Sequence, residues 1–374
     1  MSQASRVRRR LVRWLGPWSS DQRAPQDVHF ETLRLEASRD RVMDLVLVTP
    51  TKRASVGAVM VVPGLHFGGV EERRMRRFVS VLAHAGLTVA VPNLPDYLEQ
   101  VLRPGVVDDL ALALERFLKS GAIPEETRPA VFTISFGSWP GLEVACRPEL
   151  AERIGGVITF GGFADWRETL RFCVGLGHEG APDRPRDPLN RPVCFMNLMG
   201  NLPGAPTDPK AVEALFRGWR GFMERTWGRA EMKSPERYVP VAQALSAELP
   251  EGLRALFLQG CAAAPGGEAL CEAALRQCDP RPWLDPRPKL EGLRAPISIV
   301  HGRDDDVIPI EEQARLASAL PRHAEAQLYT TGLYGHSERG GAAQLLSLIP
   351  GAVQEGRTLL HMLGDLVRYA GVRP

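Results

Sequence analysis

The sequence predicts an α/β protein, with a mostly parallel central sheet, helices on both faces and a largely helical insertion. Two observations predict this fold class. Short apolar segments typical of strands alternate with amphipathic segments typical of helices on both sides of residues 166–290. Residues 166–290 themselves are rich in glycine, proline, methionine and aromatic residues and have no clear strand pattern. We therefore expect a core of residues 21–165 and 291–374 that carries residues 166–290 as an insertion.

The composition is that of a globular protein, because 44% of the residues are hydrophobic and 24% are charged. The net charge of +2 gives no reason to expect a nucleic-acid partner. No apolar run reaches the about 18 residues that a membrane span needs. The N-terminus also lacks the apolar segment of a secretory signal, so we expect a cytoplasmic protein. The six cysteines form no CxxC pair and have no histidine at metal-ligand spacing, which predicts free thiols and no metal site.

Residues 1–20 are expected to form a separate basic arm. Its apolar residues recur at helical spacing, with arginines filling much of the remainder: Val7, Leu11, Trp14, Leu15 and Trp18. Such a helix either packs on the protein's own core or on a second subunit, or lies through residues 4–18 on an anionic membrane surface. The sequence leaves both alternatives open, and it leaves the oligomeric state open as well.

The core elements follow in order along the chain. Val28–Leu35 and Val42–Val48 read as two strands joined by a polar turn. The continuous apolar run Gly57–Val62 is typical of a strand buried on both faces of a parallel sheet. Further strands are expected at 87–92, 130–134, 156–160, 297–300 and 326–329, and helices near 76–85, 106–119 and 311–320 and within 344–369.

A serine stands at the expected turn between a strand and a helix, in the segment Val131-Phe-Thr-Ile-Ser135-Phe-Gly-Ser138. Small residues lie two positions before and two and three positions after Ser135, as a sharp turn requires, because bulky neighbours would collide with the returning backbone. The same turn directs backbone N–H groups toward a nearby anion. Taken alone, the pattern also fits a simple helix N-cap.

Two further candidate residues follow strands later in the chain. The strand 297–300 runs into His301-Gly-Arg-Asp-Asp305-Asp-Val-Ile-Pro309, which places a carboxylate at the carboxyl edge of the sheet, where open α/β sheets bind their ligands. His336 follows the strand 326–329 after a short loop. A serine, an acid and a histidine, each just after a strand and in that order, predict a nucleophile with its base and its acid.

On these motifs the chain resembles the α/β-hydrolase superfamily over residues 28–165 and 291–374. The resemblance implies a catalytic triad of Ser135, Asp305 and His336. The family's acid usually lies four residues after a histidine and four before a proline, and this frame selects Asp305 over Asp304 and Asp306.

The resemblance also implies an oxyanion hole formed by the backbone N–H groups of Leu65 and Phe136. Asp165 follows the strand 156–160, where some members keep their acid, and is the reserve candidate. One departure from the family is Thr133, where most members carry glycine, so that an extra side chain crowds the turn.

The resemblance further implies that residues 166–290 form a cap or lid over the active site. Its aromatic residues and methionines either make the cap's own small core or line an apolar pocket, and His66 either faces that pocket or is a bystander. The implied function is a serine hydrolase that cleaves a carboxylic ester, or a related acyl bond, of an apolar small-molecule substrate through an acyl-enzyme. The alternatives are an acyltransferase with the same triad and a non-catalytic binding protein on the same scaffold. No P-loop or dinucleotide glycine pattern follows a strand, so no cofactor is expected.

Overall fold

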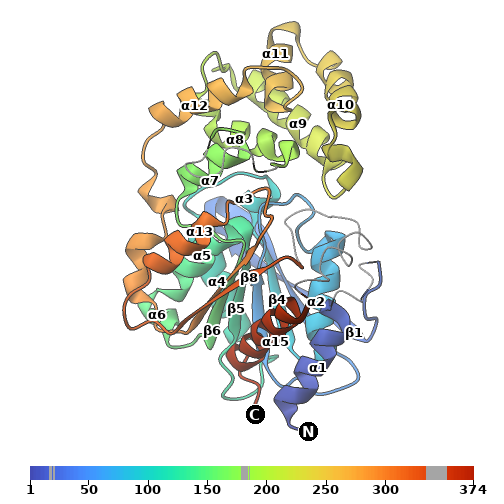
Figure 1. Cartoon of the computed structure of the whole chain (residues 1–374), viewed down its shortest axis with the longest axis vertical. Coiled ribbons are helices and arrows are strands. Elements are labelled where there is room, and N and C mark those ends of the chain that lie inside the picture. The colour runs from blue at the N-terminus through green and yellow to red at the C-terminus, as the bar shows by residue number, and fades with distance from the viewer. Residues whose placement is uncertain (17–18, 20–21, 178–183, 185, 334–351) are drawn as a thin grey trace.

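The computed structural model describes residues 1–16, 19, 22–177, 184, 186–333 and 352–374. Its centre is one eight-stranded sheet in the order β1-β2-β4-β3-β5-β6-β7-β8 (Figure 1). The strands are β1 (Val28–Ala37), β2 (Arg41–Pro50), β3 (Ala58–Val62), β4 (Thr88–Asn93), β5 (Ala130–Ile134), β6 (Gly156–Phe160), β7 (Ile297–Gly302) and β8 (Ala326–Thr331). β2 pairs antiparallel with β1 and β4, and all other pairs are parallel. The predicted fold class is confirmed.

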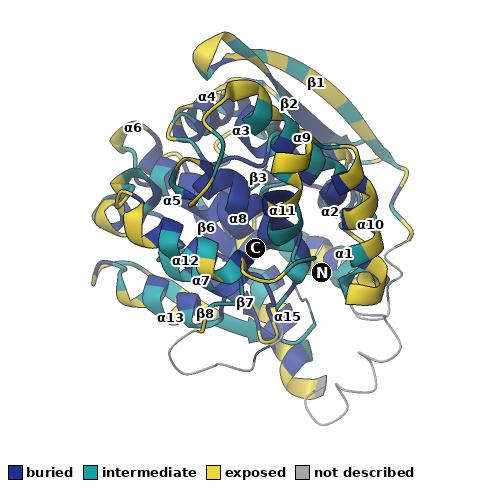
Figure 2. Cartoon of the chain, turned by 90° about the horizontal axis from the view of Figure 1, so that it is seen from above, coloured by how far each residue is buried: buried dark blue, intermediate teal, exposed yellow. Residues whose placement is uncertain are grey.

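Helices cover both faces of the sheet, because the inner strands alternate their side chains between two apolar layers. Met60 of β3 belongs to the layer under α4 (Val106–Leu118) and α5 (Ser138–Ala145). Its neighbours Val59 and Val61 belong to the layer under α2 (Arg73–Ala85) and α15 (Ala352–Tyr369). The edge strand β1 instead alternates between exposed and half-buried residues (Figure 2). Short helices α3 (Pro95–Leu98), α6 (Pro148–Ala151) and α13 (Glu311–Ser318) complete the core.

The chain between β6 and β7 is helical in its described part. It comprises α7 (Trp166–Cys173), α8 (Arg191–Leu198), α9 (Pro209–Thr226), α10 (Pro235–Ala247), α11 (Glu251–Gly260) and α12 (Gly267–Gln277). Figure 1 shows these helices above the sheet, at the end opposite the two termini. Trp219 and Phe257 are fully buried among them, so many of the aromatic residues make the insertion's own core. The limits 166–290 stay a prediction.

The basic arm forms helix α1 (Gln3–Leu15), which lies against α2 and α15. Val7 and Leu11 of its apolar stripe are buried in the same layer as those helices. The side chain of Arg77 on α2 donates a hydrogen bond to the carbonyl of Trp14 at 2.7 Å. This is packing on the protein's own core, one of the alternatives that the sequence left open. Among the described residues, no helix combines the length and the apolar character needed to cross a membrane.

Candidate active site

Ser135 lies directly after β5, at the start of a single 3₁₀ turn (η3, Ser135–Gly137) that leads into α5. Its φ of +53° falls in the left-handed region, which L-residues other than glycine adopt at a cost. Such strain persists where the surrounding structure enforces it, and it concentrates at functional sites. Ser135 is not the N-cap of either element, because the cap positions are Ile134 and Gly137 and neither makes a side-chain cap. The simple N-cap alternative is therefore not what the structure shows.

Two glycines allow the turn to pack against the loop that follows β3. A Cβ atom at Gly137 would lie 2.4 Å from the carbonyl oxygen of Pro63. A Cβ atom at Gly64 would lie 3.2 Å from the Cβ of Ser135. A Cβ atom at Gly137 would collide with the backbone, and one at Gly64 would make an unusually tight contact, so glycine at both positions favours the close approach. The loop that carries Leu65 is consequently held next to Ser135.

Thr133 is accommodated by a third glycine. Its side chain is fully buried, and its Cγ2 atom lies 2.3 Å from the position that a Cβ atom on Gly141 of α5 would occupy. Its hydroxyl donates a hydrogen bond to the carbonyl of Ile158 at 3.3 Å. The threonine that departs from the family pattern thus fills space that the adjacent helix leaves open.

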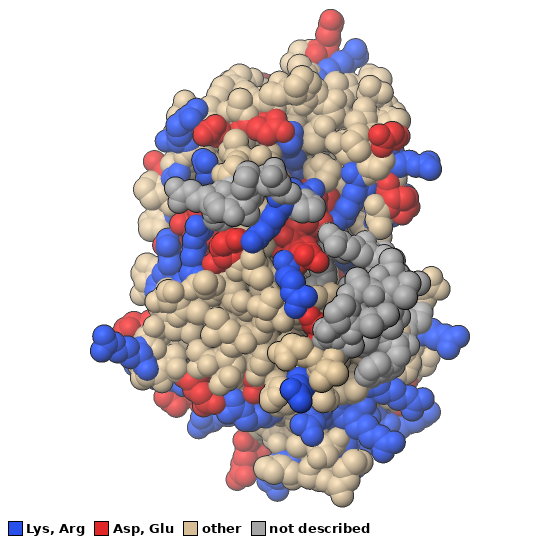
Figure 3. Space-filling view, in the orientation of Figure 1, with Lys and Arg blue, Asp and Glu red and all other residues tan. Residues whose placement is uncertain are grey.

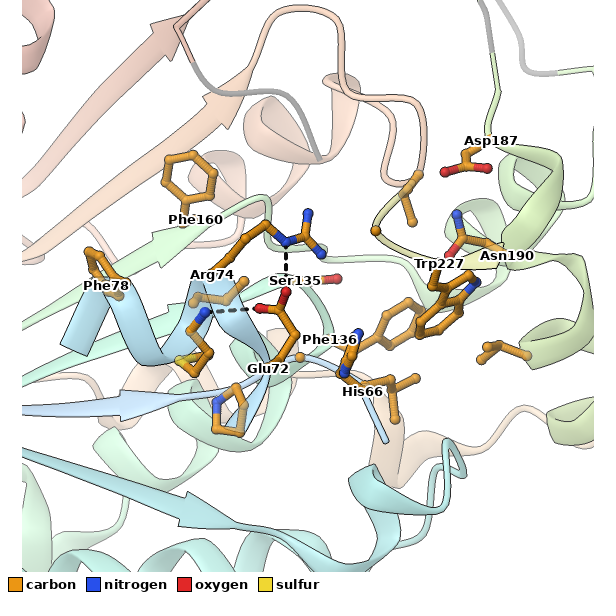
Figure 4. Close-up of a pocket in the computed structure, with 18 of the residues that line it drawn as sticks. His66, Glu72, Arg74, Phe78, Ser135, Phe136, Phe160, Asp187, Asn190 and Trp227 are labelled. Carbon is orange, nitrogen blue, oxygen red and sulfur yellow. Dashed lines mark hydrogen bonds and ion pairs between the residues drawn. The ribbon is translucent and has the colours of Figure 1, made fainter. Parts of the chain in front are cut away.

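A cavity of about 410 Å³ lies beside Ser135 (Figure 4). It is bounded on one side by the insertion and extends along the face of the sheet that α2 and α15 cover. Leu65, Ser135 and Phe136 line it from the core, so the structure brings these three predicted residues together. The insertion contributes further wall residues, of which Leu189, Val193 and Trp227 are apolar. The hydroxyl of Tyr97 donates a hydrogen bond to the carbonyl of Phe136 at 2.8 Å and secures the backbone after the serine. The wall is mostly apolar, which suits an apolar ligand.

His66 lines this cavity, which answers the question that the sequence left open about its direction. Its ring stacks on Phe67 with centroids 4.5 Å apart, and Trp227 of the insertion lies 5.5 Å away. Its Nδ1 atom accepts a hydrogen bond from the N–H of Gly68 at 3.0 Å, so the neutral ring carries its proton on Nε2. Burial lowers the pKa of His66, which keeps the ring neutral at pH 7.

A charged pair on the same wall, Glu72 and Arg74, was not predicted from any sequence pattern. Glu72 caps α2 by accepting a hydrogen bond from the N–H of Met75 at 2.9 Å, and it accepts another from Arg74 at 3.0 Å (Figure 4). Burial raises the pKa of Glu72, but Arg74 and the backbone N–H groups outweigh it, so the net shift is downward. In sequence these residues look like the solvated start of a helix, and only the fold turns them toward the cavity.

Asp305 lies in the loop after β7 and is buried. Its Oδ1 atom accepts hydrogen bonds from the N–H groups of Val307 and Ile308, both at 2.9 Å. Its Oδ2 atom lies 3.6 Å from Nε2 of His301, whose ring also contacts the carbonyl oxygen of Ile308. These two backbone hydrogen bonds fix the orientation of the carboxylate within the loop.

Asp165, the reserve acid, caps a helix. Its Oδ1 atom accepts hydrogen bonds from the N–H groups of Arg167 and Glu168 at the start of α7, and its Oδ2 atom lies 3.6 Å from Arg287.

Of the three predicted triad residues, His336 lies outside the described residues. The structure places the other two, Ser135 after β5 and Asp305 after β7, with β6 between them in one parallel sheet. Within the described ranges, no group of three or more His, Cys, Asp or Glu side chains is placed to hold a metal ion.

Comparisons with known proteins give no match to a family model and none to a curated protein. Among solved structures, the chain is similar to a bacterial brefeldin A esterase, at 15% identity and a TM-score of 0.49, covering 98% of this chain and 86% of the esterase. It is also similar to the esterase PF2001 of Pyrococcus furiosus, at 11% identity and a TM-score of 0.47, covering 92% of each chain. A third is the acylaminoacyl peptidase of Pyrococcus horikoshii, at 12% identity and a TM-score of 0.47.

That third similarity covers 93% of this chain but 43% of the peptidase, so the chain spans less than half of that protein's length.

The molecule's own architecture identifies its fold. The sheet has one antiparallel strand, β2, next to a run of parallel strands, a strained serine turn follows β5, and a helical insertion follows β6. By its strand order and its serine turn, the chain has the fold of the α/β-hydrolase superfamily.

Proposed function

We propose that the protein is a serine hydrolase that cleaves a carboxylic ester, or a related acyl bond, through an acyl-enzyme on Ser135. The observation that carries this proposal is the strained backbone of Ser135, with a φ of +53°, at the wall of an apolar cavity. A purely structural serine needs neither the strain nor the two glycines that bring the neighbouring loop against it.

The reaction would run in two steps. His336 accepts the proton of the Ser135 hydroxyl as its oxygen bonds to the substrate carbonyl carbon, and it then gives that proton to the departing alcohol. In the second step His336 takes a proton from water, whose oxygen bonds to the acyl carbon. The bond from that carbon to the Ser135 oxygen then breaks, the acid is released, and His336 returns the proton to Ser135. Asp305 orients the imidazole and stabilises its charged form.

The oxyanion formed in each step would be stabilised by the N–H groups of Leu65 and Phe136. Losing one donor of this kind costs about 3 kcal/mol in a serine hydrolase. The contacts of Gly64 and Gly137 with the opposite segment support this role, because they hold the two donor segments against each other. The apolar wall of the cavity supports an apolar substrate.

The first test is labelling by a fluorophosphonate probe together with hydrolysis of p-nitrophenyl esters of increasing chain length. We expect the wild type to be labelled and Ser135→Ala to lose labelling and about 10⁴-fold or more of its rate. Ser138→Ala is the matched control, because this buried serine lies in the same turn and contacts the N–H of Phe163. Activity that survives Ser135→Ala would refute the proposal, and a wild type that takes no label would favour a non-catalytic binding protein. Product analysis with and without an added alcohol separates hydrolysis from acyl transfer.

The second test separates the two candidate acids. Asp305→Asn should lower kcat by about 10⁴-fold, because the asparagine no longer stabilises the charged imidazole or selects its tautomer. Asp165→Asn should leave kcat nearly unchanged, and it should keep the cap of α7, because the asparagine oxygen can accept the same hydrogen bonds from Arg167 and Glu168. The opposite ranking of the two kcat values would transfer the acid's role to Asp165.

A further inference from the structure

The loop that carries Asp305 is joined to the insertion by a lysine. Lys233 ends a short 3₁₀ segment of the insertion (η6, Ala230–Lys233), and its ammonium contacts an oxygen of Asp306 and lies 3.3 Å from one of Asp187. The N–H of Asp187 also donates a hydrogen bond to the carbonyl of Asp306 at 3.0 Å. Two separate segments of the insertion therefore meet at the residue next to Asp305. Figure 3 shows acidic and basic side chains gathered where the insertion meets the core.

The burial of these groups makes the lysine important. Asp187 and Asp306 are 7% and 8% exposed, and the side chain of Lys233 is 25% exposed. Buried carboxylates that face each other are stable only when a cation or a proton offsets their charge. Burial raises the pKa of Asp187, and the charge of Asp306 raises it as well. Lys233 and the N–H of Leu189 lower that pKa in part, and the net shift is upward. The ammonium thus lies where it offsets the charge of both carboxylates at this contact.

We propose that Lys233 is a positioning residue, which holds the Asp305 loop in its working geometry by neutralising Asp187 and Asp306. This inference rests on the proposed function, because it gives Asp305 a place in the reaction. Lys233 acts through Asp306, the chain neighbour of Asp305. The carboxylate of Asp305 also accepts from the N–H of Val307, whose carbonyl accepts a hydrogen bond from the thiol of Cys173 on α7 at 2.9 Å. Hydrogen bonds hold the rest of this loop in place. A displacement of Asp306 would therefore move Asp305, its neighbour in the chain, relative to these bonds.

Removing the ammonium should make the reaction newly sensitive to pH. Without it, one of the two carboxyls keeps a proton at low pH and the contact persists. As the pH rises, that proton is lost, the two carboxylates repel each other and the loop separates from the insertion. Among the described residues, the thiol of Cys173 and the carboxylate of Asp305 also lie near this contact. Hydrogen bonding with Cys194 and burial hold the pKa of Cys173 well above its usual range, so the thiol stays neutral.

The experiment compares kcat, KM and the pH profile of ester hydrolysis in the wild type, Lys233→Met, and Lys233→Met combined with Asp187→Asn. Lys210→Met, an exposed lysine on α9, is the matched control. We expect Lys233→Met to lose about 10- to 100-fold in kcat, as small displacements of catalytic groups do, with the loss growing as the pH rises. Asp187→Asn in the same chain should restore activity and remove the added pH dependence, because the amide carries no charge.

A loss that does not vary with pH, or that Asp187→Asn does not relieve, overturns the positioning role. If Lys233→Met does not fold, Asp187→Asn alone decides the question. It should stay active because Lys233 still neutralises Asp306, and its inactivation overturns the proposal. The two proposals fail in different ways. A wild type that hydrolyses no ester and takes no probe refutes the hydrolase, whereas an active wild type whose Lys233→Met variant matches Lys210→Met refutes only the positioning role.

Discussion

Replacing Gly141 by alanine should destabilise the protein, although alanine is the better helix former. Gly141 lies inside α5, where alanine gains about 1 kcal/mol over glycine. Its new Cβ atom, however, would lie 2.3 Å from Cγ2 of Thr133, whereas carbon atoms in contact are normally about 3.5–4.0 Å apart. Thr133 cannot turn away easily, because it is fully buried in β5 and its hydroxyl bonds the carbonyl of Ile158.

The size of the effect follows from these contacts. Overpacking of this kind costs about 1–3 kcal/mol, and giving up the threonine hydrogen bond costs about 1 kcal/mol more. Subtracting the gain in helix propensity leaves a net loss of about 1–3 kcal/mol. For a chain of 374 residues, an unfolding entropy of about 2.1 cal/mol/K per residue converts this loss into a fall in Tm of about 1–4 °C.

Thermal unfolding of a double-mutant cycle checks this reasoning. In Thr133→Ala the offending methyl group is gone, and the two Cβ atoms would be 3.5 Å apart, which is ordinary contact. Gly141→Ala should therefore lower Tm in the wild type and raise it in the Thr133→Ala background. Gly364→Ala on α15 controls for helix propensity, because outside the helix's own backbone no atom of the described residues lies within 4 Å of the new Cβ, and it should raise Tm. If Gly141→Ala raises Tm as much as Gly364→Ala does, the crowding argument is refuted.

Two further predictions concern the layer under α1 and α2. Leu11→Ala should destabilise the protein by about 2–5 kcal/mol in urea unfolding, because Leu11 is fully buried; a change below 0.5 kcal/mol, as at an exposed position, would contradict this packing. Burial alone would raise the pKa of Asp27, but the hydrogen bond and charge of His84, 2.6 Å away, and the charge of Arg53 outweigh it and lower that pKa. A carboxyl with a lowered pKa stabilises the fold at pH values above its unfolded-state pKa. The wild type should therefore have a higher Tm than Asp27→Asn near pH 7, and this difference should shrink below about pH 4. A difference in Tm that persists in acid would contradict the ion pair.

The strands were predictable because each one carries its own signal. The run Gly57–Val62 is apolar throughout, and in the structure β3 is fully buried between two helical layers. The serine turn was predictable for a similar local reason, since the small residues around Ser135 are the ones that a sharp turn needs. The grouping of Ser135, Leu65 and Phe136 around one cavity agrees with what the family resemblance implied.

Other features depend on contacts between distant segments, which no local pattern encodes. Thr133 departs from the family pattern, and only the approach of α5 at Gly141 explains why it fits. The apolar stripe of α1 was equally suited to a membrane surface, and packing against α2 and α15 decided its place.

The sequence by itself determined the strand-helix alternation, the place of the insertion and the position of the strained serine, because strand periodicity and turn sterics act over a few residues. Only the tertiary structure decided which charged groups meet. Lys233, Asp187 and Asp306 come from three segments, and Coulomb and desolvation energies depend on distance and burial, which become defined when the insertion docks on the core.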